Sequence, residues 1–329
     1  QNYRDWVSGA IGRFNSESGT LGSPGIFSLR RFMTEADIAD PAGPIWFFHT
    51  KDNPYGDTRL FDAQLKVAEI LFGPTAAPEQ RVRQLEHIQH EWVRLTMEAA
   101  RRRKWYCAGL LFWMYNDCWP ATGWSLVDYY GAPKAGWYAM KRAGQPVIAS
   151  IEDVGGSFRI WACNDTLSPV KGKMSLRVQG WSGAPRWERV VPFSLPANSS
   201  VVVAEILKAD LPLPGLDSVL AADLKAGKHC DRAWHFNGLP FQMSPPPVEL
   251  VVRREPRKGT REAVVIKADS YARVVTLEAG IDFSDNYFDM LPGEERRIEW
   301  DTQPEVSHIS IGCWNDSGRT VNSGKSDMC

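Results

Sequence analysis

The segment from Tyr106 to Pro120 reads YCAGLLFWMYNDCWP, and its pattern decides how the first part of the chain folds. The residues from Tyr106 to Tyr115 form a continuous apolar run, which is typical of a strand buried on both faces of a parallel sheet. The run is far shorter than the ~20 residues that cross a bilayer. A polar loop begins at Asn116 and Asp117. We therefore predict a buried strand with polar groups at its carboxyl end.

Patterns of helix and strand alternate on both sides of this segment. Apolar residues at three- and four-residue steps predict helices, and turn signals set their ends. The sequence predicts a strand over Val7 to Ser16, helices over Ser23 to Met33, Leu60 to Phe72, Pro78 to Arg103 and Ala135 to Ala143, and a loop over Asp40 to Asp57. The charged residues Arg101 to Lys104 are expected to form a solvated last helical turn, where basic side chains are favourable.

Alternation of strand and helix indicates a parallel α/β fold for residues 1–145. This stretch supplies only about two βα units, whereas a complete (β/α)8 barrel needs roughly 250 residues. It is therefore either a small α/β domain or the last part of a larger barrel. If it is cut from a barrel, the apolar strand from Ala108 to Tyr115 lacks a neighbour on one side. Because exposed sheet edges drive association, we expect cover from the chain itself or from a second copy in a homodimer.

Beyond residue 145 the apolar residues recur at every second position. Phe158, Ile160 and Ala162 alternate with polar neighbours, and so do Met174 and Leu176. About seven short strands at roughly 8–12-residue spacing predict an antiparallel β-sandwich over residues 146–244. The run of prolines at 245–247 is a stiff linker. The same pattern after it predicts a second sandwich over residues 245–329.

The composition excludes several classes of protein. The chain has 329 residues and a formal net charge of -1, so no overall field attracts nucleic acid or an anionic membrane. Its six cysteines form no CxxC pair and no cluster with histidine, which argues against a disulfide framework and a zinc site. We expect neither a metal nor an organic cofactor. Five of the 14 tryptophans fall between Trp105 and Trp137, which indicates either a tryptophan-rich core or a flat binding platform.

One long stretch resembles a known family. Gly109 to Ala135 reads GLLFWMYNDCWPATGWSLVDYYGAPKA and closely resembles the last barrel strand and loop of β-mannosidase-like enzymes of glycoside hydrolase family 2. Trp161 to Thr166 and Pro196 to Ser200 are similar to the sandwich that follows the barrel, and Phe283 to Glu294 is similar to the terminal sandwich. The resemblance covers nearly the whole chain. It implies the last two βα units of a TIM barrel followed by two immunoglobulin-like sandwiches.

The resemblance also implies a catalytic nucleophile. In this family a glutamate ends the seventh barrel strand, and the segment FNSESG from Phe14 to Gly19, with Ser23 and Pro24 downstream, fits that place. Glu17 therefore inherits the role of nucleophile in a retaining glycosidase. A retaining enzyme forms a covalent glycosyl ester on one carboxylate, while a second carboxyl ~5–5.5 Å away acts as acid and then as base.

The implied sugar site follows the second strand. Trp113 is expected to form the floor of the site for the cleaved sugar, because the C–H face of a sugar stacks on an indole. Asn116 and Asp117 are expected to bond its hydroxyls, with a structural role as the alternative for Asp117. Trp119 and Trp124 are expected to line the entrance. The polar loop from His49 to Asp57 either touches substrate or is ordinary surface.

Two departures from the family limit what the resemblance implies. Ser18 stands where the family has an aromatic residue after the nucleophile, so the identity of the sugar is open. The acid/base glutamate of the family belongs to an Asn-Glu pair at the end of the fourth strand, and no such pair occurs in the 329 residues. The chain is thus expected to be the C-terminal portion of a longer enzyme, inactive alone, whose partner is the N-terminal part.

The sequence therefore predicts a β-mannosidase-like hydrolase that releases terminal β-D-mannose from the non-reducing end of oligosaccharides. Another exo-β-glycosidase of the family, acting on glucosaminides, galactosides or glucuronides, is the first alternative. A non-catalytic carbohydrate-binding module made of the sandwiches is the second.

Overall fold

The computed structural model describes residues 11–50, 60–74, 77–212, 216–303, 306, 308–316 and 321–322. The chain folds into two compact units, each made of three separate stretches. The first comprises residues 1–19, 91–113 and 139–244, and the second comprises residues 20–90, 114–138 and 245–329. Helices α6 (Pro78–Arg102) and α7 (Ala135–Ala143) contribute to both and match their predicted ranges closely.

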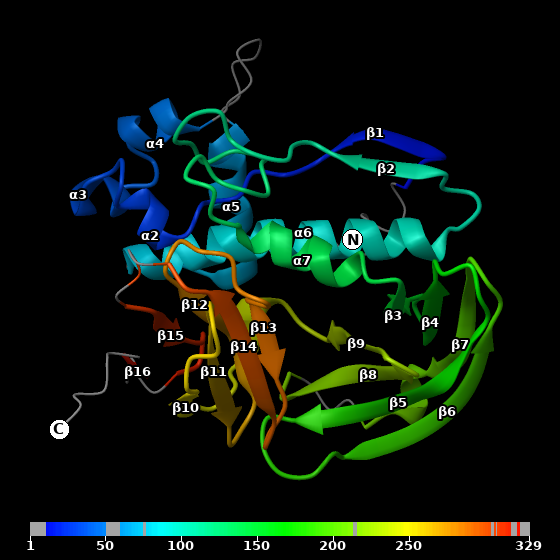
Figure 1. Ribbon diagram of the computed structural model, residues 1–329. Coiled ribbons are helices and arrows are strands. Elements are labelled where there is room, and N and C mark those ends of the chain that lie inside the picture. The colour runs from blue at the N-terminus through cyan, green and yellow to red at the C-terminus, as the bar shows by residue number, and fades with distance from the viewer. Residues whose placement is uncertain are drawn as a thin grey trace. The chain divides into compact units, whose positions relative to one another are not determined.

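The first unit contains a β-sandwich (Figure 1). A three-stranded sheet has the order β3 (Val147–Asp153), β4 (Ser157–Asn164), β7 (Ser199–Leu207), and a four-stranded sheet has the order β6 (Trp187–Leu195), β5 (Val170–Gly180), β8 (Ser218–Ala226), β9 (His229–Phe236). All pairings are antiparallel. Phe158, Ile160, Met174 and Leu176 are buried in the shared core, which confirms the inward positions that the period of two predicted.

The first unit also contains a small parallel sheet, made of β1 (Phe14–Ser18) and β2 (Gly109–Phe112). The prediction that β2 is buried on both faces is wrong, since Leu111 is 54% exposed. A strand becomes buried on both faces only when further strands and helices surround it. Among the described residues, β1 is the only strand paired with β2. The homodimer that such an edge favours remains a prediction.

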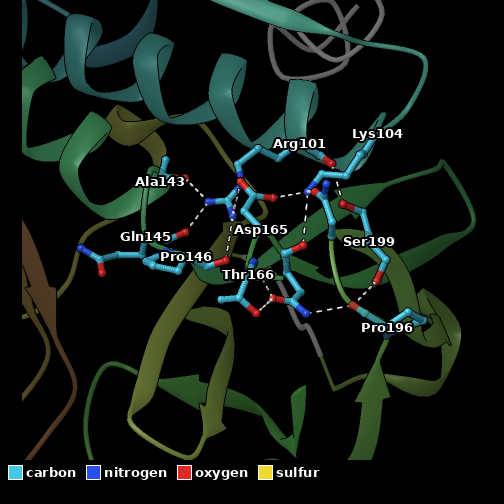
Figure 2. Close-up of polar contacts among 12 residues, drawn as sticks. Arg101, Lys104, Ala143, Gln145, Pro146, Asp165, Thr166, Pro196 and Ser199 are labelled. Atoms are coloured by element: carbon cyan, nitrogen blue, oxygen red, sulfur yellow. Dashed lines mark hydrogen bonds and ion pairs between the residues drawn. The ribbon is translucent and has the colours of Figure 1, made fainter. Parts of the chain in front are cut away.

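The last turn of α6 is enclosed by polar partners, which corrects the prediction of a solvated turn (Figure 2). Arg101 Nη1 donates hydrogen bonds to the carbonyl oxygens of Ala143 at 2.5 Å and Gln145 at 2.7 Å. Arg101 also pairs with Asp165 at 3.1 Å, and Lys104 pairs with the same carboxylate. These bonds pair the basic side chains of the last turn with groups that lie at least 42 residues further along the chain. The run of basic residues is therefore a docking point for the sandwich of this unit.

The second unit contains the other sandwich. One sheet has the order β10 (Leu250–Arg254), β11 (Arg261–Ala268), β14 (Glu295–Asp301), and the other has the order β13 (Phe288–Met290), β12 (Ala272–Glu278), β15 (Ser310–Gly312), β16 (Val321–Asn322). Val264, Ile266, Leu277 and Ile298 are buried in its core. The two sandwiches predicted after residue 145 are thus present, while the boundaries 1–145, 146–244 and 245–329 remain a prediction.

The helical part of the second unit departs from the prediction in two places. Helices α2 (Ile26–Leu29) and α5 (Leu60–Phe72) lie within predicted helices, whereas α3 (Glu35–Ile38) follows the predicted end at Met33 and was not predicted. The predicted loop from residue 40 contains helix α4 (Pro44–His49), which starts with proline at its first turn. Trp46 stabilises α4, because its buried indole donates a hydrogen bond to Asp37 O at 2.8 Å. Within the described ranges, no helix is long and apolar enough to span a membrane.

Candidate functional site

Glu17 and Trp113 lie at the same end of the small parallel sheet. Between the paired positions Asn15 and Ser18, β1 has two residues, Ser16 and Glu17, where β2 has one. This bulge is followed by a hydrogen bond of 2.8 Å from Trp113 N to Ser18 O. Bulges redirect side chains and are over-represented beside active sites. The sequence pattern predicted a strand end near Glu17, but nothing in the pattern indicated the bulge.

Both side chains are accessible in the first unit. Glu17 is exposed, and the Trp113 indole is 51% exposed. In the part of the chain that the structure describes, the Glu17 carboxylate has no ion pair or hydrogen bond, so its oxygens are free to react. The arrangement thus provides an accessible carboxylate and an accessible aromatic face at the carboxyl end of neighbouring parallel strands, where the active sites of α/β barrels lie.

The loop after β2 belongs to the second unit and is folded back on itself. Asn116 forms an isolated parallel bridge with Val127, and Asp117 N donates to Val127 O at 3.1 Å. Asn116 is exposed, whereas Asp117 is buried with only 2% of its surface exposed. Asn116 and Asp117 were both expected to bond the sugar hydroxyls, but they have different environments, and of the two only Asn116 is open to solvent.

A buried lysine holds this loop in place. Lys134 Nζ lies 3.1 Å from Asp117 Oδ2, and it donates hydrogen bonds to the carbonyl oxygens of Gly22 at 3.1 Å and Gly123 at 3.2 Å. An ammonium has three N–H donors, so these three oxygens can satisfy all of them. Ser125 Oγ donates to the same Asp117 oxygen at 2.5 Å. For Asp117 we therefore propose the structural role, since its covered carboxylate binds Lys134 and Ser125.

Helix α6 supports the far side of the same loop. Gln89 Nε2 donates hydrogen bonds to Ser125 O at 3.0 Å, and to Trp124 O and Thr20 O at 3.4 Å. Gly22 packs directly against this amide, and a side chain at position 22 would collide with it. Trp124 is thus held through its backbone. Nothing in the periodicity of α6 distinguishes Gln89 from other polar positions, so the sequence analysis missed it.

Trp119 belongs to an aromatic cluster at the end of α4. Its ring stacks on His49 with centroids 5.3 Å apart, and the edge of Phe48 contacts it at 5.5 Å. A ring nitrogen of His49, Nδ1, lies 2.8 Å from Pro120 O, which fixes the orientation of the imidazole. Phe48 is 65% exposed. Of the loop predicted from residue 49, His49 and Thr50 are therefore placed, and residues 51–57 lie outside the described residues.

Within the described ranges, no group of three or more histidine, cysteine, aspartate or glutamate side chains is placed to hold a metal ion.

Comparison with known proteins identifies both sandwiches. Residues 156–237 match the model of the mannosidase Ig/CBM-like domain, and residues 244–309 match the model of an Ig-fold domain of mannosidases. Beta-mannosidase B of Aspergillus niger is 24% identical over 318 residues, which cover 88% of this chain and 36% of that protein. Beta-mannosidase B of Thermothelomyces thermophilus is 29% identical over 235 residues, which cover 59% of this chain and 26% of that protein. The chain thus spans roughly a third or less of these relatives.

Solved structures agree in fold. The β-D-mannosidase of Dictyoglomus thermophilum matches with a TM-score of 0.85 and 24% identity, over 95% of this chain and 38% of that one. The exo-chitosanase of Amycolatopsis orientalis matches with a TM-score of 0.74 and 18% identity, over 94% and 42%. At these identities the likeness establishes a shared fold.

Proposed function

We propose that this chain, which is a β-mannosidase-like C-terminal region of glycoside hydrolase family 2, supplies the nucleophile of a retaining exo-β-mannosidase. The substrate in this proposal is a terminal β-D-mannoside at the non-reducing end of an oligosaccharide. The first two strands are then the last βα units of the catalytic barrel. The two sandwiches are its immunoglobulin-like C-terminal domains.

The observation that supports this proposal most strongly is the position of Glu17. Its carboxylate is accessible at a bulge, one residue before the hydrogen bond that joins Ser18 to Trp113. A carboxylate at this place can attack the anomeric carbon, form a glycosyl ester and release the aglycone. The Trp113 indole offers the apolar C–H face of the same sugar a flat surface. The nucleophile and the platform then act on one sugar ring.

The proton donor of this reaction is assigned to an N-terminal part of the same enzyme. A retaining mechanism needs a second carboxyl that protonates the leaving oxygen and later activates water. The sequence contains no Asn-Glu pair of the type that provides this group in the family. We call the protein that contains both this chain and that N-terminal part the joined enzyme.

The chain by itself is expected to hydrolyse p-nitrophenyl β-D-mannoside at least ~10²–10⁴-fold more slowly than the joined enzyme, because general acid–base help of that size is missing. The joined enzyme is expected to hydrolyse it. The measurement is nitrophenol release from equal molar amounts of the two proteins. Hydrolysis by the chain alone that is as fast as that of the joined enzyme and disappears in the Glu17→Gln variant would contradict the assignment of the proton donor to another part.

One other sugar class has specific support. The fold similarity to an exo-chitosanase favours β-glucosaminides as the second candidate. The test compares kcat/KM of the joined enzyme for four p-nitrophenyl glycosides: the β-mannoside, β-glucosaminide, β-galactoside and β-glucuronide. They share one leaving group, so differences in kcat/KM report on the sugar. The proposal predicts the highest kcat/KM for the mannoside. If kcat/KM is higher for the glucosaminide, the substrate in the proposal becomes a β-glucosaminide.

A further inference from the structure

A buried carboxyl joins α6 to the terminal sandwich inside the second unit. Glu86 lies on α6 and is only 1% exposed. Its Oε1 accepts a hydrogen bond of 3.0 Å from the hydroxyl of Tyr287, which precedes β13. Among the residues that the structure describes, Oε2 of Glu86 has no hydrogen-bond partner. A carboxylate buried with a single donor is poorly compensated for its loss of water.

The charges around Glu86 make ionisation still less favourable. Glu278 of β12 is a second acidic group that acts on Glu86, and Arg83 of α6 is the cation that acts on both. Arg83 Nε lies 3.7 Å from Glu278 Oε1, so the guanidinium pairs with Glu278. Tyr138 of α7 packs on Tyr287, with ring centroids 5.8 Å apart, and brings no positive charge. The cation that acts on Glu86 thus lies beside Glu278, on which Arg30 and Glu79 also act with opposite effects.

The expected protonation states follow from these surroundings. Burial and the nearby Glu278 raise the pKa of Glu86 well above its usual value. Burial also raises the pKa of Glu278, although Arg83 opposes this effect. Burial raises the pKa of Tyr287 as well, so its hydroxyl stays a donor.

We propose that Glu86 is a neutral carboxylic acid in the folded protein and that its contact with Tyr287 is a pH-sensitive latch between α6 and the terminal sandwich. The packing at this contact is stable while Glu86 holds its proton. When the proton leaves, a poorly compensated charge is buried and destabilises the packing, although the hydrogen bond from Tyr287 to the carboxylate itself becomes stronger. This property is independent of the proposed hydrolysis, because it concerns the packing of the second unit and involves none of the candidate site residues.

The direction of the pH effect can be derived from proton linkage. In the unfolded chain Glu86 loses its proton near the ordinary glutamate pKa of ~4.3. In the folded chain it keeps the proton to a higher pH. Over the interval between these two values the folded state binds more protons, so the free energy of unfolding falls as the pH rises. Above the folded-state pKa the loss is complete.

The Glu86→Gln variant of the full chain tests the latch. Glutamine has nearly the same shape, accepts the Tyr287 hydrogen bond and carries no ionisable proton. At pH 7 the wild type is expected to release more protons on unfolding than this variant, by up to about one, measured by calorimetry in buffers of different ionisation enthalpy. At pH 8 the variant is expected to unfold at least about 3 °C higher, with little difference at pH 4. Equal proton release by the two proteins would overturn the proposal.

Two further variants complete the test. Glu295→Gln changes an exposed glutamate of β14 in the same unit and is expected to leave proton release at pH 7 unchanged. Glu278→Gln removes the acidic neighbour of Glu86. The pH above which unfolding releases no extra proton is therefore expected to be lower in this variant than in the wild type. This second result does not depend on the folding of Glu86→Gln. An unchanged profile in Glu278→Gln would also contradict the proposal, because the two carboxyls would then be independent.

Discussion

Replacement of Glu17 by alanine is expected to reduce turnover of p-nitrophenyl β-D-mannoside by the joined enzyme on the order of 10⁶-fold, the scale seen when an enzyme loses its nucleophile. Sodium azide is expected to restore part of this activity. The alanine leaves a space beside the anomeric carbon, and azide can attack from that side. Since the displacement inverts the configuration, the product is expected to be α-mannosyl azide, identified by its anomeric proton resonance.

Trp113→Ala is the matched control for this rescue. Trp113 lies at the end of the neighbouring strand and is accessible like Glu17, but it offers an apolar face and no nucleophile. Its loss is expected to lower kcat/KM through weaker binding of the sugar and its transition state. Azide is expected to have no effect on this variant. Rescue of Trp113→Ala, or full activity of Glu17→Ala, would show that the roles are wrongly assigned.

Replacement of Lys134 by methionine is expected to lower the free energy of unfolding by about 3–5 kcal/mol, because it leaves the buried Asp117 carboxylate without its cation. It also removes the hydrogen bonds that Lys134 donates to the carbonyl groups of Gly22 and Gly123. Urea unfolding of the full chain measures the change. The loop that carries Asn116 is expected to become more accessible to protease in the same variant.

Two variants control for the substitution itself. Lys66→Met changes an exposed lysine of α5 and is expected to alter stability by less than about 0.5 kcal/mol. The double variant Lys134→Met with Asp117→Asn removes both charges and is expected to regain part of the lost stability. If Lys134→Met were as stable as Lys66→Met, the Lys134 contacts would not be what holds the loop.

The sequence predicted the sandwiches better than the region before them. Strand positions such as Phe158 and Ile160 follow from alternation, because each strand of a sandwich has one buried and one open face. The prediction that β2 is buried on both faces was wrong because such burial depends on the neighbouring strands and helices. A run of apolar residues carries no information about those neighbours. Leu111 is apolar and exposed for this reason.

Charged residues were the least predictable feature of the chain. Lys134 and Arg101 have the same one-dimensional pattern as surface residues, yet both are enclosed. Their partners are backbone carbonyls and carboxylates remote in sequence, and the pairing depends on the folded chain. The strand ends that carry Glu17 and Trp113 could be placed from sequence. The bulge at Glu17 and the burial of Asp117 required the structure.

Covalent trapping of Glu17 tests the central claim most directly. In 2-deoxy-2-fluoro-β-D-mannosyl fluoride the leaving fluoride needs no proton donor, and the fluorine at C2 slows breakdown of the glycosyl ester. Mass spectrometry of the joined enzyme after reaction is expected to find one fluoromannosyl group, attached to Glu17 in the peptide that contains Phe14 to Gly19, and none in the Glu17→Gln variant. A label on a different carboxylate, in an enzyme that still hydrolyses mannosides, would contradict the account.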